Sequence, residues 1–170
     1  MSGSLLIVDD DDTTAALVAE VLSDEGFTVT HLGNTTSDAI RAAVNRLEPD
    51  VVLLDGSDKI GYSDSWANAA WLHERARPVA VLMFTSHATD LAEGQLGETE
   101  RSQRAGFVGF VGKPFDLDML LVQVKRAATV IARGIASQRD PANAIAIRGC
   151  MVDPKAWASH DDVDDCPFVS

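Results

Sequence analysis

The stretch VVLLDG at residues 51–56 decides how this chain can fold. Four branched apolar residues follow one another without the spacing of a helix face, and the run is too short for a helix. Such a run is typical of a strand that is buried on both faces, as in a parallel sheet. Asp55 follows it directly and therefore lies at the carboxyl end of the strand, where open α/β sheets bind their ligands.

Further apolar runs also end in polar side chains. Residues 5–8 (LLIV) lead into Asp9 and Asp10, residues 79–84 (VAVLMF) lead into Thr85 and His87, and residues 107–111 (FVGFV) lead through Gly112 into Lys113. If these runs are neighbouring parallel strands, their polar side chains meet at one edge of the sheet. Clustered carboxylates repel one another and need a hard cation such as Mg²⁺, while a hydroxyl and an ammonium suit an anion beside it. The combination suits phosphoryl transfer to Asp55.

Helical periodicity separates the apolar runs. A first helix is predicted after Asp11 or Asp12, either of which can cap it, and a second after Ser37, its expected cap. Others cover residues 66–75 and begin at Asp116. Residues 27–32 alternate like a strand near an edge of the sheet. Strands and helices thus alternate five times, which predicts a flavodoxin-like α/β fold, a doubly wound five-stranded parallel sheet with helices on both faces.

Residues 87–105 fit this alternation least well. Their large apolar residues are only Leu91 and Leu96, and Gly94 and Gly97 would weaken a helix. We expect a short helix followed by a mobile loop.

Composition limits the classes of function. The chain has 170 residues, of which 46% are hydrophobic and 24% charged, and its formal net charge is −12. This charge argues against a nucleic-acid surface, which needs clustered lysine and arginine. No apolar run approaches the ~18 residues of a membrane span, so we expect a soluble, cytoplasmic protein without membrane insertion. Cys150 and Cys166 show no metal-ligand spacing and are expected to be reduced.

Periodicity ends near Ala136. We therefore expect one domain over residues 1–136 and an acidic C-terminal tail over residues 137–170 that is partly disordered. The tail is too short and too acidic for a DNA-binding helix-turn-helix.

The order of these motifs resembles that of a response-regulator receiver domain, the phospho-accepting module of two-component signalling. The resemblance covers residues 5–133 and rests on five features in the family's order, each within or after an apolar run. They are an acidic pair (Asp9, Asp10), a phosphoacceptor (Asp55), a switch hydroxyl (Thr85), a switch aromatic (Phe110) and a lysine followed by proline (Lys113), whose peptide bond is typically cis in the family.

The resemblance implies a role for each matching residue. Asp10 and Asp55 would bind Mg²⁺ directly, Asp9 would act partly through water, and the backbone carbonyl of Ser57 would complete the protein ligands. Asp55 would take a phosphoryl group from a sensor histidine kinase, a histidine phosphotransfer protein of a phosphorelay, or a small acyl phosphate. The protein would be a signalling phosphoacceptor rather than an enzyme, catalysing only its own phosphorylation and dephosphorylation.

Other residues would respond to the phosphate. Thr85 and Lys113 would bind the phosphoryl oxygens, and Phe110 would turn inward and bias a two-state equilibrium. Ser57 and His87 occupy positions that tune phosphate lifetime in the family. The output expected of this stand-alone receiver is contact with a downstream protein target, with homodimerisation left open.

Two departures from the family concern the surroundings of the site. Lys59 stands where many receivers have proline, and the segment between Thr85 and Lys113 is longer than is common. Both concern the partner and output surfaces rather than the site.

Two other functions compete with phosphate-dependent signalling. A phosphatase of the haloacid-dehalogenase type would use Asp9 as nucleophile, since Asp9, Asp11 and Thr13 fit its first motif, but the order of the later motifs disagrees. A pseudo-receiver would act as an interaction module without phosphorylation, and the altered loop after Asp55 keeps this alternative open.

Overall fold

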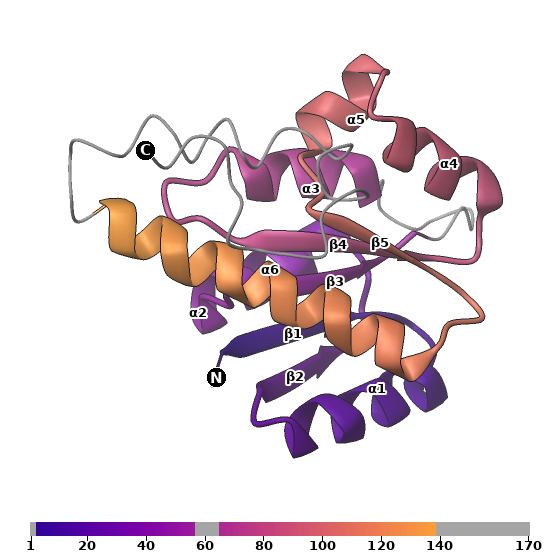
Figure 1. Ribbon diagram of the computed structural model, residues 1–170, viewed down its shortest axis with the longest axis vertical. Helices are drawn as coiled ribbons and strands as arrows, with labels where there is room; N and C mark the ends of the chain where they lie inside the picture. Colours follow the sequence, from indigo (N-terminus) through magenta and orange to yellow (C-terminus); the bar gives the residue numbers. More distant parts are fainter. Residues whose placement is uncertain (1–2, 57–64, 139–170) are drawn as a thin grey trace.

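The computed structural model describes residues 3–56 and 65–138. Its strands are β1 (Ser4–Val8), β2 (Thr28–Leu32), β3 (Val51–Asp55), β4 (Ala80–Thr85) and β5 (Gly109–Gly112). Its helices are α1 (Asp12–Asp24), α2 (Ser37–Leu47), α3 (Ser65–His73), α4 (Ala88–Leu96), α5 (Glu100–Ala105) and α6 (Leu117–Gln138), as labelled in Figure 1.

All strand pairs are parallel and the strand order is β2-β1-β3-β4-β5. The predicted doubly wound α/β fold is therefore confirmed. The chain runs from β1 outward to β2 and then returns past β1 to β3, so the direction of winding reverses between β1 and β3. The carboxyl ends of these two strands border the crevice in which such sheets bind ligands.

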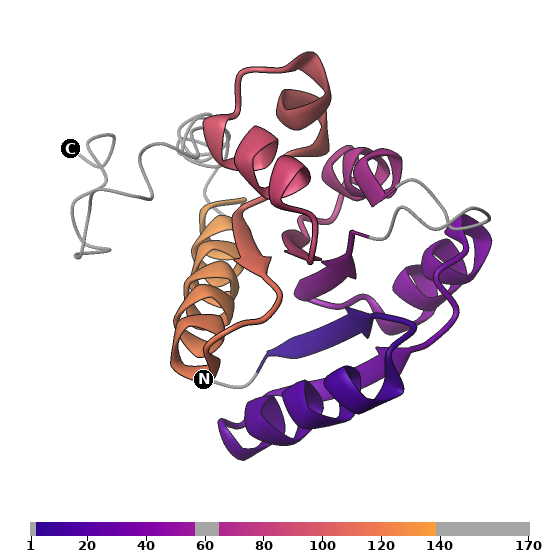
Figure 2. The same ribbon diagram turned by 90° about the vertical axis from the view of Figure 1, so that its right-hand side faces the viewer.

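Alternate residues of each strand enter two separate hydrophobic cores. In β1 and β3, Ile7 and Leu53 pack against α1 and α6, whereas Leu6 and Val52 pack against α2 and α3. Figure 2 shows these two helix layers on opposite faces of the sheet. β3 is buried on both faces, as the unbroken apolar run at residues 51–54 predicts.

The helix starts are set by local hydrogen bonds. Asp11 caps α1 by accepting from the backbone N–H groups of Thr13 and Thr14. The cap of α2 is Thr36, which accepts from the N–H of Ala39, and not Ser37 as predicted; Ser37 is the first helical residue. Asp116 accepts from the N–H of Met119 at the start of α6.

The prediction of a loop after one short helix in residues 87–105 is wrong. The segment forms α4 and α5, which Figure 1 shows near α3 and the edge of the sheet that ends in β5. Gly97 ends α4 in a left-handed conformation with φ of 65°, and Thr99 then caps α5 by accepting from the N–H of Ser102. Arg101 ties the two helices together through ion pairs with Asp90 and Glu93. Polar caps and ion pairs therefore supplement the few apolar contacts of this segment, such as that of the buried Ala105.

No helix of the described residues is long and apolar enough to span a membrane. The helix α6 continues to Gln138, slightly beyond the expected domain boundary at residue 136. The rest of the predicted acidic tail, with Cys150 and Cys166, lies outside the described residues, as does Lys59.

Candidate functional site

Three carboxylates lie close together at the carboxyl ends of β1 and β3, the strands between which the direction of winding reverses. Asp9 and Asp10 follow β1, Asp55 ends β3, and one oxygen from each lies within 4.8 Å of the others. Strand pairing explains the meeting, since Val8 lies beside Leu54 at the ends of these strands. Asp9 is almost fully buried and Asp55 nearly so, with 1% and 8% of their side chains exposed. Hard oxygen ligands in this number and spacing fit a divalent cation such as Mg²⁺.

Lys113 joins two of these carboxylates from the far side of β4. Its Nζ lies 2.7 Å from Oδ2 of Asp9 and 2.8 Å from Oδ1 of Asp55. The ammonium also lies 4.4 Å from the centre of the Phe84 ring, which gives it an additional electrostatic contact. The backbone N–H of Lys113 donates to the carbonyl of Thr85 at 2.7 Å. The peptide bond between Lys113 and Pro114 is cis, as the resemblance implies.

The cluster changes the proton affinity of its members. Burial raises the pKa of Asp55 above 3.8; the hydrogen bond and positive charge of Lys113 oppose this, and the charges of Asp9 and Asp10 add to it. Burial alone would lower the pKa of Lys113, but its hydrogen bonds to Asp55 and Asp9 outweigh burial and raise it above 10.5. An excess of negative charge therefore remains beside a fully protonated lysine.

Thr85 is buried next to the residue that follows Asp55. Its Oγ1 donates to the carbonyl of Gly56 at 3.0 Å and accepts from the N–H of His87 at 3.0 Å. A Cβ atom at position 56 would lie only 2.8 Å from this Oγ1. Glycine at position 56 therefore leaves the space that the threonine hydroxyl occupies.

Phe110 lies away from the carboxylates, on the side of α4. Its ring is half-buried, lies 5.6 Å from that of Phe107 and occupies the space beside Gly94, where a Cβ atom would overlap it. His87 is partly buried at the N-cap position of α4. Ser57, predicted to supply a ligand carbonyl and to tune phosphate lifetime, lies outside the described residues.

Sequence reasoning missed His31. His31 belongs to β2, and its Nε2 lies 2.8 Å from the backbone carbonyl oxygen of Asp9. The available sequence signal was the position of His31 near the carboxyl end of the predicted strand at residues 27–32. The structure shows that this strand lies beside β1 and that His31 pairs with Ile7.

The chain belongs to the response regulator receiver domain family, whose model matches residues 5–125. It is thus a receiver domain of two-component response regulators, a family of signalling phosphoacceptors that bind Mg²⁺ in an acidic pocket. This membership argues against the haloacid-dehalogenase alternative.

Solved structures of receiver domains resemble the whole fold. The receiver domain of NtrX from Brucella abortus is 29% identical, with a TM-score of 0.62 and coverage of 74% of this chain and 98% of that one. A response regulator from Thermotoga maritima is 24% identical, with a TM-score of 0.61 and coverage of 76% and 99%. The chemotaxis response regulator CheY4 of Vibrio cholerae is 20% identical, with a TM-score of 0.60 and coverage of 75% and 99%. The last two show the fold alone. A search of curated proteins finds no match.

Proposed function

We propose that Asp55 accepts a phosphoryl group in a reaction that depends on Mg²⁺. The observation that carries this proposal is that Asp9, Asp10, Asp55 and Lys113 lie together at the carboxyl ends of the strands, where the direction of winding reverses between β1 and β3. A carboxylate oxygen of Asp55 forms the new bond to phosphorus while the bond from phosphorus to the donor's nitrogen or oxygen breaks. The electron pair of the broken bond leaves with the donor.

The carboxylates divide the work of holding the cation. Asp10 and Asp55 are the proposed direct ligands, together with the carbonyl of Ser57. Both oxygens of Asp9 are already engaged, Oδ2 by Lys113 and Oδ1 by the N–H of Asp11 at 2.9 Å. This engagement supports an indirect role for Asp9. Bound Mg²⁺ would neutralise the charge that accumulates on the phosphoryl oxygens.

Lys113 and Thr85 are the proposed ligands of the transferred phosphoryl group. Lys113 already contacts the carboxylate that would carry the phosphate. Thr85 must give up its bond to the carbonyl of Gly56, a neutral bond that contributes about 1 kcal/mol, for a stronger bond to a charged oxygen. Phe110 would then change its packing against α4, while His87 and Ser57 would influence the water that removes the phosphate.

Donors and outputs follow from this assignment. The donor would be a sensor histidine kinase or a histidine phosphotransfer protein. The output would be contact between a downstream protein and the surface formed by α4, β5 and α6. The domain proposed to do this covers residues 1–136, with the tail over residues 137–170 outside it.

Intact mass spectrometry after incubation with acetyl phosphate and Mg²⁺ tests the proposal. Wild type should gain one phosphoryl group, about 80 Da, and Asp55→Asn should gain none. A gain that persists in Asp55→Asn would contradict the assignment and direct attention to Asp9. No gain in wild type, either with acetyl phosphate or with a kinase, would favour the pseudo-receiver.

A further inference from the structure

His31 contacts the turn between β1 and α1 from a neighbouring strand. Its imidazole is partly buried, with 27% of the side chain exposed, and Nε2 lies 2.8 Å from the carbonyl oxygen of Asp9. A carbonyl oxygen can only accept a hydrogen bond, so Nε2 must carry the proton. Its other ring nitrogen, Nδ1, lies 4.0 Å from Oδ1 of Asp12, in the first turn of α1.

This bond continues the attachment of β1 to β2 beyond the last paired residues of the two strands. The regular pairing ends at Val8 and Leu32, after which the N–H of Asp9 donates to the carbonyl of Leu32 at 3.2 Å. The His31 side chain then holds the carbonyl of the same aspartate. Both backbone polar groups of Asp9 are therefore bound to β2, although the chain there has left the sheet.

The carbonyl of Asp9 belongs to the peptide group that connects Asp9 to Asp10. Because a peptide group is planar, fixing this carbonyl fixes the plane of the peptide and the position of the next Cα atom, from which the Asp10 side chain starts. The Asp9 side chain cannot serve the same purpose, because its oxygens are bound to Lys113 and to the N–H of Asp11. Within the part of the chain that the structure describes, the His31 side chain holds this carbonyl.

We propose that His31 is a positioning residue of the divalent-cation site, whose Nε2–H orients the peptide between Asp9 and Asp10 so that the Asp10 carboxylate faces Asp55. The inference rests on the proposed function, since it assumes that these carboxylates bind Mg²⁺. His31 itself contacts neither the cation nor the phosphoryl group. It acts through the backbone, so its contribution depends on a donor at the position of Nε2 and not on positive charge.

The test compares substitutions that keep or remove this donor. In His31→Gln the amide nitrogen can reach the position of Nε2, whereas in His31→Asn it lies closer to the backbone, near the position of Nδ1. His31→Leu has similar bulk and no donor. His73→Leu is the matched control, because it removes an exposed imidazole from the far end of α3.

Isothermal titration calorimetry with Mg²⁺ provides the main measurement, and the rate of phosphorylation by acetyl phosphate at limiting and saturating Mg²⁺ provides the second. We expect the Mg²⁺ Kd to rise about fivefold in His31→Asn and His31→Leu, corresponding to the loss of one hydrogen bond, and to stay within about twofold of wild type in His31→Gln and His73→Leu. Phosphorylation should be slowed at limiting Mg²⁺ and largely restored at saturating Mg²⁺.

Unfolding by urea distinguishes positioning from a purely structural role. If His31 only supports the fold, His31→Asn and His31→Leu lower the free energy of unfolding while the Mg²⁺ Kd stays at the wild-type value, and the inference is overturned. An equal loss of affinity in His31→Gln and His31→Leu would also overturn it, because the donor would then not matter. Absence of Mg²⁺ binding by wild type would instead refute the proposed cation site itself.

Discussion

Asp55 is a nearly buried carboxylate with two further carboxylates beside it and one lysine to offset them. Burial raises its pKa, which means that the folded domain favours the protonated form. The folded state is therefore relatively favoured below the ordinary pKa of 3.8, and this advantage is lost as the pH rises through the folded-state pKa. At neutral pH the charge of Asp55 is a cost to stability that the reaction requires.

Asp55→Asn should accordingly be more stable than wild type in buffer without Mg²⁺, by about 1 kcal/mol at neutral pH. The difference should grow as the pH rises from about 4 and become constant near pH 7, because the charge being removed is then complete. Urea unfolding across this range measures it. Mg²⁺ should reduce the difference by binding wild type more tightly, and a variant less stable than wild type at every pH would contradict the electrostatic account.

Gly56→Ala tests the space around the switch hydroxyl. The added methyl group would lie 2.8 Å from Oγ1 and 2.9 Å from Cβ of Thr85, so the buried threonine must move and weaken its bond to the carbonyl of Gly56. We expect a loss of about 1–3 kcal/mol in the free energy of unfolding, measured with urea. Gly33→Ala is the control, because a methyl group there would meet its nearest neighbour at 3.5 Å, an ordinary contact. Equal losses in both variants would argue against the steric explanation.

At the scale of elements, α4 packs closely against β5 at Gly94. Gly94 of α4 faces the ring of Phe110, and that ring packs on Phe107, which in turn meets Trp66 of α3 edge-on at 5.4 Å. A side chain at position 94 would occupy the space that the Phe110 ring now fills. The packing of α4 and the position of Phe110 therefore depend on each other.

A double-mutant cycle measures this dependence. Gly94→Ala alone should destabilise the domain by about 1–3 kcal/mol, because the ring of Phe110 is displaced. In a Phe110→Ala background, the same substitution should be neutral or stabilising by up to about 1 kcal/mol, the usual gain from replacing glycine by alanine within a helix. Identical effects of Gly94→Ala in the two backgrounds would show that α4 and Phe110 are not coupled in this way.

The strands were predictable because their burial leaves a direct mark on the sequence. Apolar runs of strand length predicted β1 and β3, and the position of Asp55 after its run placed the carboxylate at the edge of the sheet. The helices α4 and α5 were not predictable from apolar periodicity, because they contain few large apolar residues; Thr99 as a cap and Arg101 as an ion-pair partner contribute to them as well. The place of His31 near the carboxyl end of a strand was visible in the sequence, but its contact with the carbonyl of Asp9 depends on strand register and side-chain direction, which the sequence does not show.

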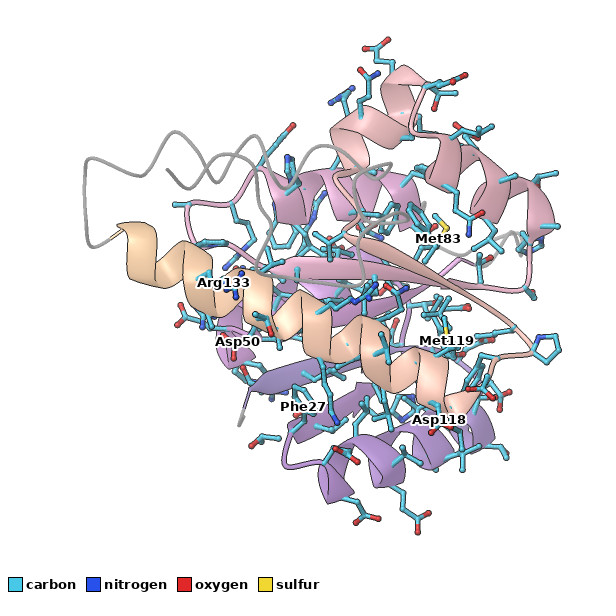
Figure 3. All side chains as sticks on the ribbon, in the orientation of Figure 1. Phe27, Asp50, Met83, Asp118, Met119 and Arg133 are labelled. Atoms are coloured by element: carbon cyan, nitrogen blue, oxygen red, sulfur yellow. The ribbon has the colours of Figure 1, made fainter. Side chains whose placement is uncertain are left out.

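Across the whole molecule, the carboxyl ends of the strands form the candidate site, whereas contacts at their amino ends stabilise the fold. The carboxyl ends of the strands hold the charged cluster, beside the start of α6 where Figure 3 labels Asp118 and Met119. Asp50 lies at the opposite end, where its Oδ2 accepts from the N–H and Oγ of Ser4, both at 2.9 Å, and its Oδ1 pairs with Arg77 at 3.1 Å. This end joins the starts of β1 and β3, whereas Asp9, Asp10, Asp55 and Lys113 follow the carboxyl ends of the strands.

Asp50→Ala should therefore lower stability without changing the cation site. Loss of these bonds leaves the N–H of Ser4 without its acceptor, and we expect a decrease of about 1–3 kcal/mol in the free energy of unfolding. Urea unfolding measures the decrease, and calorimetric titration at a temperature well below the midpoint should give an unchanged Mg²⁺ Kd. A weaker Kd in the folded variant would mean that the two ends of the sheet are energetically connected.

The central claim is that the phosphoryl group resides on Asp55, and chemical trapping tests it most directly. Borohydride reduces an aspartyl phosphate to homoserine, which peptide mass spectrometry can assign to a single position. After reaction with acetyl phosphate and Mg²⁺, the account predicts homoserine at position 55 and its absence when Mg²⁺ is chelated. Homoserine at position 9 or 10, or equal labelling at position 55 without Mg²⁺, would contradict it.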